Sequence, residues 1–140
     1  MCSDFPLTVN RDGNIYYAST RPNSPKIIRR TPDGKESVLA SDKIFEFVNG
    51  IADGKDGSIY ITESSNPNAN TVRKISMDGK VSIIATFVGK AGKDLPLETV
   101  PSYCRGLAVD SSGIIYVAAT GSRSILKISP QGNIETIRQE

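Results

Sequence analysis

The sequence predicts an all-β fold of three four-stranded blades that together form half of a β-propeller. Two features of the chain lead to this prediction. A segment ending in Gly-x-Ile-Tyr recurs three times, and a second glycine-containing turn follows each copy. In addition, no part of the chain shows a sustained helical period. A unit of four antiparallel strands that repeats every ~45–55 residues is typical of propeller blades.

Each copy predicts two tight turns. The aligned segments are Leu7–Tyr16, Ile51–Tyr60 and Leu107–Tyr116. Their shared glycines are Gly13, Gly57 and Gly113, and the glycines of the second turn are Gly34, Gly79 and Gly132. Because glycine adopts positive φ at little steric cost, these positions favour hairpin turns. The tyrosines that close each segment recur as well, which identifies them as packing residues.

The predicted strands follow the same order in every unit. The first strands are residues 7–9, 51–52 and 107–109, and the second strands are 15–18, 59–62 and 115–118. The third strands are 26–30, 71–75 and 124–128, and the fourth strands are 37–40, 82–86 and 134–138. Polar loops at 19–25, 63–70 and 120–123 separate the second strand from the third. A single domain over residues 1–140 is expected, with blades at about 4–40, 47–87 and 104–138.

Composition excludes several classes of function. The formal net charge of +2 is too small to indicate a nucleic-acid partner. No stretch approaches the ~18–20 apolar residues that span a membrane. The first residues, Met1 to Leu7, contain neither a basic n-region nor an apolar h-region, so no signal peptide is visible and a cytoplasmic location is the default expectation.

The cysteine and histidine content limits the possible metal sites and catalytic groups. The chain has two cysteines, Cys2 and Cys104, and no histidine. A structural zinc site needs about four nitrogen or sulfur ligands, so one chain cannot form it from these residue types. Histidine-dependent catalytic triads are excluded for the same reason. Two free thiols and a Cys2–Cys104 disulfide both remain open.

The repeated motifs resemble those of a known group of propellers. Val48-Asn-Gly-Ile51 and Cys104-Arg-Gly-Leu107 precede an alanine, and Lys-Ile-Ser-x-x-Gly recurs at 74–79 and 127–132. This pattern resembles NHL-repeat proteins and the wider set of six-bladed propellers that includes regucalcin, the gluconolactonases and strictosidine synthase. The resemblance implies a ring of six blades, of which three are present. Because three blades would leave two apolar faces exposed, we expect a second copy to close the ring as a homodimer. A fragment of a longer propeller is the alternative.

The resemblance to regucalcin-like lactonases also implies a divalent metal such as calcium at one end of the channel. Its Glu, Asn and Asp ligands would stand just before the small residue of the innermost strands. Asn49 matches the asparagine and Asp4 lies near the expected glutamate, but Arg105 stands where an aspartate is expected. A guanidinium at this position repels a cation and favours an anion or carboxylate. We therefore expect no metal site.

Glu63 is a further candidate, because only one of the three copies carries a carboxylate there. The equivalent residues are Ser19 and Ala119. The alternatives are a solvated loop residue and an ion-pair partner of Arg105. The connection Val88–Tyr103 likewise differs from its counterpart and is either a functional loop on one face or a tolerated surface loop.

These residues favour an NHL-like binding or interaction module that takes a small anionic ligand or a protein partner at the channel or a disc face. The predicted ligand-binding residues are Asn49, Arg105, Glu63 and Asp4. The alternative is a regucalcin- or gluconolactonase-like, metal-dependent lactonase. No nucleophile paired with a base is evident, which favours a role without catalysis.

Overall fold

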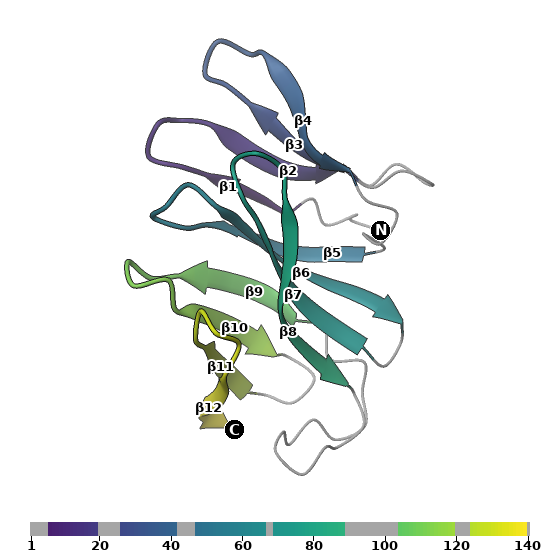
Figure 1. The fold of residues 1–140 in the computed structure, drawn as a ribbon, viewed down its shortest axis with the longest axis vertical. Coiled ribbons are helices and arrows are strands. Elements are labelled where there is room, and N and C mark those ends of the chain that lie inside the picture. Colours follow the sequence, from purple (N-terminus) through teal and green to yellow (C-terminus); the bar gives the residue numbers. More distant parts are fainter. Residues whose placement is uncertain are drawn as a thin grey trace.

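A computed structural model describes residues 6–19, 26–41, 47–66, 69–88, 104–119 and 124–139. These residues form twelve strands in three four-stranded antiparallel sheets. Figure 1 shows the sheets following one another along the longest axis of the molecule. The predicted fold of three four-stranded blades is confirmed. In the described part of the chain, no helix is long and apolar enough to cross a bilayer.

Within each sheet the strands follow one another in chain order, as in a meander. The first blade contains β1 (Leu7–Val9), β2 (Ile15–Ser19), β3 (Lys26–Arg30) and β4 (Glu36–Ser41). The second contains β5 (Phe47–Asp53), β6 (Ile59–Asn66), β7 (Ala69–Ile75) and β8 (Val81–Val88). The third contains β9 (Cys104–Val109), β10 (Ile115–Ala119), β11 (Ser124–Ile128) and β12 (Ile134–Gln139). The second blade therefore has the longest strands of the three.

The first tight turns of the three blades, which join β1 to β2, β5 to β6 and β9 to β10, lie on the left of Figure 1. All six glycines predicted to adopt positive φ do so. Polar side chains complete these turns: the Asn10 carboxamide accepts hydrogen bonds from the backbone N–H groups of Asp12 and Asn14, and the Asp110 carboxylate accepts them from Ser112 and Ile114. Such side-chain caps satisfy backbone donors that no strand partner reaches.

Asp78 plays a similar role in the second turn of the second blade. Its carboxylate accepts hydrogen bonds from the Ser76 hydroxyl and from the backbone N–H of Lys80. These bonds favour the ionised form, so they hold the pKa of Asp78 below its ordinary value of 3.8. The pKa of Asp33 in the first blade is lowered for the same reason.

A lowered carboxyl pKa makes stability depend on pH in a defined direction. The contribution of Asp78 is fully present above its unfolded pKa and is lost as the pH falls through its folded pKa. Replacement by glutamine, which the third blade carries naturally as Gln131, is expected to destabilise the chain above about pH 5 and to have a shrinking effect below about pH 4. Urea unfolding of both proteins across pH 3–7 measures this difference, and a difference that grew towards low pH would contradict the assignment.

The hydrophobic core lies between the blades. One buried cluster joins the first and second blades and includes Tyr16 and Ile27 from the first with Ile59, Ile61 and Ile75 from the second. A second cluster joins the second and third blades and contains Tyr60, Val72, Ala85, Ile115, Val117, Ala119, Leu126 and Ile128. Each blade interface is thus a stack of two apolar sheet faces, as expected for face-to-face sheet packing.

A backbone contact also fixes the spacing between consecutive blades. Gly79 lies so close to the carbonyl oxygen of Leu39 that a Cβ atom there would come within 2.5 Å of it. Gly132 stands in the same relation to the carbonyl oxygen of Ile84, at 2.3 Å. Leu39 and Ile84 are the extra residues at the β-bulges in β4 and β8. The second turn of each of these blades therefore docks on the bulged outer strand of the preceding blade.

Candidate functional site

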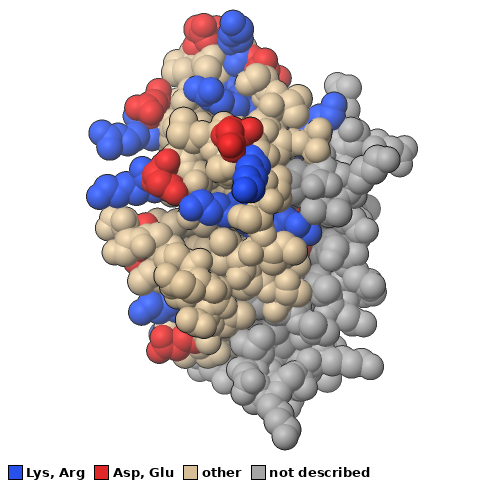
Figure 2. Space-filling model, in the orientation of Figure 1, with Lys and Arg blue, Asp and Glu red and all other residues tan. Residues whose placement is uncertain are grey.

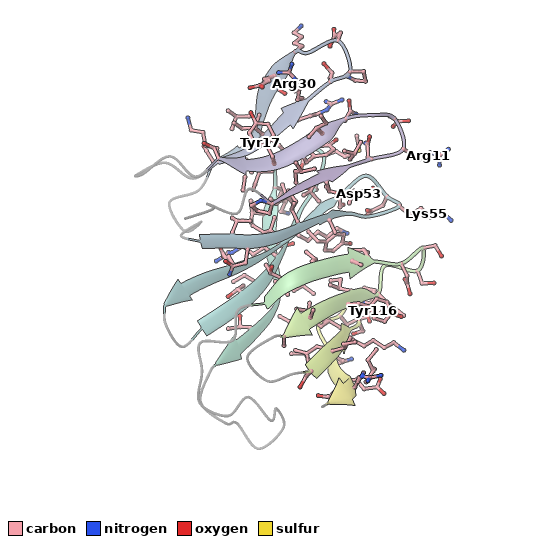
Figure 3. All side chains as sticks on the ribbon, turned by 180° about the vertical axis from the view of Figure 1, so that it is seen from behind. Arg11, Tyr17, Arg30, Asp53, Lys55 and Tyr116 are labelled. Carbon is pink, nitrogen blue, oxygen red and sulfur yellow. The ribbon has the colours of Figure 1, made fainter. Side chains whose placement is uncertain are left out.

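The innermost strands β1, β5 and β9 lie next to one another and bring the starts of the three repeats together. The Thr8 hydroxyl of β1 donates a hydrogen bond of 2.8 Å to the carboxylate of Asp53 at the end of β5. Asp53 thereby ties two innermost strands together near the tight turns (Figure 3). The opposite ends of β5 and β9 carry two of the predicted ligand-binding residues.

Asn49 and Arg105 occupy equivalent β-bulges. In β5, Val48 pairs with Glu63 and Gly50 pairs with Thr62, so Asn49 is the extra residue. In β9, Cys104 pairs with Ala119 and Gly106 pairs with Ala118, so Arg105 is the extra residue. Both positions were expected to precede the strands; the structure places them inside β5 and β9, because these strands begin earlier than predicted. Bulges of this kind interrupt the ladder and re-aim a side chain, and they are frequent beside binding sites.

Glu63 lies in β6 and is fully buried, so the alternative that it is a solvated loop residue is wrong. The strand continues to Asn66 because β6 and β7 keep their pairing well beyond the equivalent strands of the other blades. The carboxylate of Glu63 forms an ion pair with the guanidinium of Arg73 on β7. Arg73 is only 8% exposed. Because both groups are removed from water, each charge has to be compensated by the other.

Arg73 is the residue that sequence reasoning missed. The equivalents of Glu63 and Arg73 are Ser19 and Ile28 in the first blade, and Ala119 and Leu126 in the third. Both members of the pair therefore depart from the repeat at neighbouring positions on adjacent strands. A search for cross-strand pairs that differ from the other repeats, rather than for single residues that differ, could have found Arg73. Glu63 is engaged by Arg73, and Asp4 and the side chain of Arg105 lie outside the described residues.

Those residues at this end that the structure describes do not fit the divalent metal that the resemblance implies. Among the residues that the structure describes, no three carboxylate or thiol side chains gather closely enough to hold a metal ion. Glu63 forms an ion pair with Arg73, and the bulge equivalent to Asn49 holds an arginine instead of an acidic residue.

The rim formed by the tight turns carries charges of both signs. Figure 2 shows lysine and arginine side chains alternating with aspartate and glutamate along its left side. Arg11 and Lys55 belong to the first turns of two neighbouring blades (Figure 3). Lys74 is bound by Asp56 at 3.1 Å and lies over the ring of Tyr60. Burial by itself raises the pKa of Asp56, but the hydrogen bonds from Ser58 and Lys74 outweigh it and leave that pKa below 3.8.

The repeat and the propeller architecture agree with a match to a sequence family. Residues 7–139 match the family described as SMP-30/Gluconolactonase/LRE-like region. The chain belongs to this family. The match covers all twelve described strands, so the SMP-30/gluconolactonase-like assignment applies to all three blades. No curated protein sequence matches the chain significantly.

Solved structures show the same architecture. A nidogen/laminin complex matches with a TM-score of 0.68 and 13% identity over 94% of this chain and 45% of the other. A gluconolactonase from Xanthomonas campestris has a TM-score of 0.65 and 17% identity over 93% and 44%, respectively. The calcium-binding protein regucalcin from Agrobacterium tumefaciens gives 0.61 and 16% over 94% and 42%.

These likenesses establish the fold. The chain spans less than half the length of each of these three structures. Since the regucalcin- and gluconolactonase-like neighbours are six-bladed propellers, the three blades correspond to half of such a ring.

Proposed function

We propose that the chain is a binding module of the propeller type whose ligand site lies at the bulged ends of β5 and β9. The observation that carries the proposal is the coincidence of Asn49 and Arg105 at equivalent bulges on adjacent innermost strands. A bulge costs ladder hydrogen bonds, so two of them at the same level of the channel wall indicate positions shaped for something other than strand pairing.

The chemistry of the two side chains favours an anion. A guanidinium offers up to five N–H donors in a planar fork that matches a carboxylate or phosphate, and a carboxamide offers both donors and an acceptor. Glu63, which pairs with Val48 in the β5–β6 register, forms an ion pair with Arg73. The proposed ligand is a small carboxylate or phosphate anion bound at the end of the channel.

Replacement of Arg105 by glutamine is expected to weaken anion binding by about 10- to 100-fold, because a hydrogen bond to a charged group contributes about 1.5–3 kcal/mol. Isothermal titration with sodium gluconate and with inorganic phosphate measures this effect. Arg11→Gln is the matched control, since it removes the same charge from the exposed rim of tight turns. If the two variants bind both anions as tightly as the unmodified chain does, the proposed site is wrong.

A lactonase is the second candidate, because the chain belongs to the SMP-30/gluconolactonase-like family and Asn49 fits the expected ligand pattern. This function needs a divalent cation that the described residues do not accommodate. Hydrolysis of gluconolactone can be followed with and without millimolar calcium, alongside the melting temperature, which a cation bound only to the folded state must raise. Hydrolysis abolished by a chelator, with a calcium-dependent rise in melting temperature, would replace the binding proposal with the lactonase.

A further inference from the structure

The chain forms the same kind of interface twice, between its first and second blades and between its second and third blades. One outer face of the first blade and one of the third are the two sides of a further interface of this kind that no blade of the same chain covers. In each blade, the front face is the sheet face towards the preceding blade, and the rear face is the one towards the following blade. The rear-face residues Ile27 and Val72 are 0% exposed, whereas their equivalent on the third blade, Ile125, is 37% exposed. Ile125 has lost the cover that its two equivalents receive.

The front face of the first blade shows the complementary loss. Ile51 on the innermost strand of the second blade is 7% exposed, but its equivalent in the first blade, Leu7, is 58% exposed. Ile59 and Ile115 are buried at 1% and 0%, whereas Ile15 is only half-buried. The equivalents of Ile15 share buried clusters with the equivalents of Ile125. The front of the first blade and the rear of the third are therefore complementary in type.

The contact between a turn glycine and a bulged strand, which joins consecutive blades, is also incomplete on both outer faces. Gly34 is equivalent to Gly79 and Gly132, has φ of +90° and has only the side chain of Arg30 near its would-be Cβ. On the third blade, Ile137 is the bulged residue equivalent to Leu39 and Ile84, and it is 47% exposed. The outer face of the first blade therefore carries the turn glycine Gly34 with no bulged strand against it. The outer face of the third blade carries the bulged residue Ile137 with no turn glycine against it.

The outer faces also carry a pair of opposite charges that the internal interfaces lack. Arg138 stands where the first two blades have the buried residues Ala40 and Ala85. Glu36 stands where the other blades have Val81 and Ile134, which pack against the clusters that contain those alanines. Where the inner interfaces have an alanine on one side and Val81 or Ile134 on the other, the outer faces thus present an arginine and a glutamate.

We infer that a second copy of this chain closes the ring, with the front face of each first blade against the rear face of the partner's third blade. Three of six blades occupy half a turn, so a two-fold rotation brings both pairs of faces together in two identical seams. Gly34 docks on the carbonyl of the partner's Ile137, and Glu36 pairs with the partner's Arg138. Tyr17 and Arg30, both labelled in Figure 3, donate hydrogen bonds to Glu36 at 3.1 and 2.9 Å and so orient its carboxylate.

A second copy would complete the channel at whose end the anion is proposed to bind, and in this respect the inference rests on the proposed function. The oligomeric state is measured on the 140-residue chain without ligand, by size-exclusion chromatography with light scattering. A dimer together with no anion binding would overturn the proposed function and leave the second-copy inference intact. A monodisperse monomer, or open-ended oligomers, would overturn the second-copy inference, because another set of blades would then have to cover the faces.

Charge reversal tests the seam itself. Glu36→Arg and Arg138→Glu each place like charges in both seams, and each is expected to weaken the dimer at least about tenfold. The double variant, and an equimolar mixture of the two single variants, restore opposite charges and are expected to dimerise. Arg11→Glu, on the rim of tight turns, is the control. Circular dichroism verifies that every variant is folded. Single variants that dimerise normally, or a double variant that stays monomeric, would contradict the proposed pairing.

Discussion

Replacement of Glu63 by alanine is expected to lower the free energy of unfolding by about 3–5 kcal/mol, because it leaves the guanidinium of Arg73 buried without its counter-charge. Glu63 is fully buried and Arg73 nearly so, at the interface between the first and second blades. Water cannot compensate a charge there at low cost. Arg73→Leu is expected to be destabilising for the converse reason, since it strands a buried carboxylate.

The chain provides its own control for this experiment. In the third blade the same two positions hold Ala119 and Leu126, which are 1% and 0% exposed. The double variant Glu63→Ala, Arg73→Leu copies that arrangement into the second blade. Because a buried ion pair can be replaced by apolar residues at little net cost, the double variant is expected to recover most of the loss. Urea unfolding of the four proteins gives the coupling energy, and additive losses in the double variant would show that the pair does not act as a unit.

Gly132→Ala is expected to be the second most disruptive change, with a loss of about 2–5 kcal/mol. The residue has φ of +92°, which costs an L-amino acid about 1–2 kcal/mol. The added methyl group would also come within 2.3 Å of the carbonyl oxygen of Ile84, and relief of such overpacking costs a further ~1–3 kcal/mol. The obstacle is backbone, so a change of rotamer cannot relieve it.

Gly113→Ala separates the two contributions. Gly113 has φ of +81°, but a Cβ atom there would lie 3.6 Å from Pro130, which is ordinary van der Waals contact. This variant is expected to lose only the ~1–2 kcal/mol that follows from positive φ. Thermal and urea unfolding of both variants measure the difference. Equal losses would mean that the approach of the second turn to the preceding blade contributes nothing to stability.

The sequence predicted the blades because their determinants are local. Glycine at fixed offsets and Ile-Tyr after it specify a turn and the strand that follows, and the structure confirms the turns and the burial of Tyr16 and Tyr60. Strand ends were less accurate: β6 extends through Glu63 to Asn66. Polar residues there suggested a loop, but cross-strand pairing with β7 and the ion pair with Arg73 outweigh their low strand propensity.

The candidate site was predicted in part. Sequence comparison among the repeats selected Asn49 and Arg105, and the structure brings both to equivalent bulges. A bulge depends on register against the neighbouring strand, which no single segment of sequence specifies. The partner of Glu63 was hidden for the same reason, because Arg73 comes within its reach only once β6 and β7 are paired.

The arrangement of the cores between consecutive blades has a consequence for how the protein unfolds. Each buried cluster draws on two consecutive blades, so stability approximates a sum of single-blade terms and nearest-neighbour coupling terms, as in a short linear array. The second blade takes part in both couplings, whereas the first and third blades take part in one each. In a linear array the terminal units fray first. A closed ring has no terminal unit, so ring closure would convert local opening of one blade into an event that must break two couplings at once.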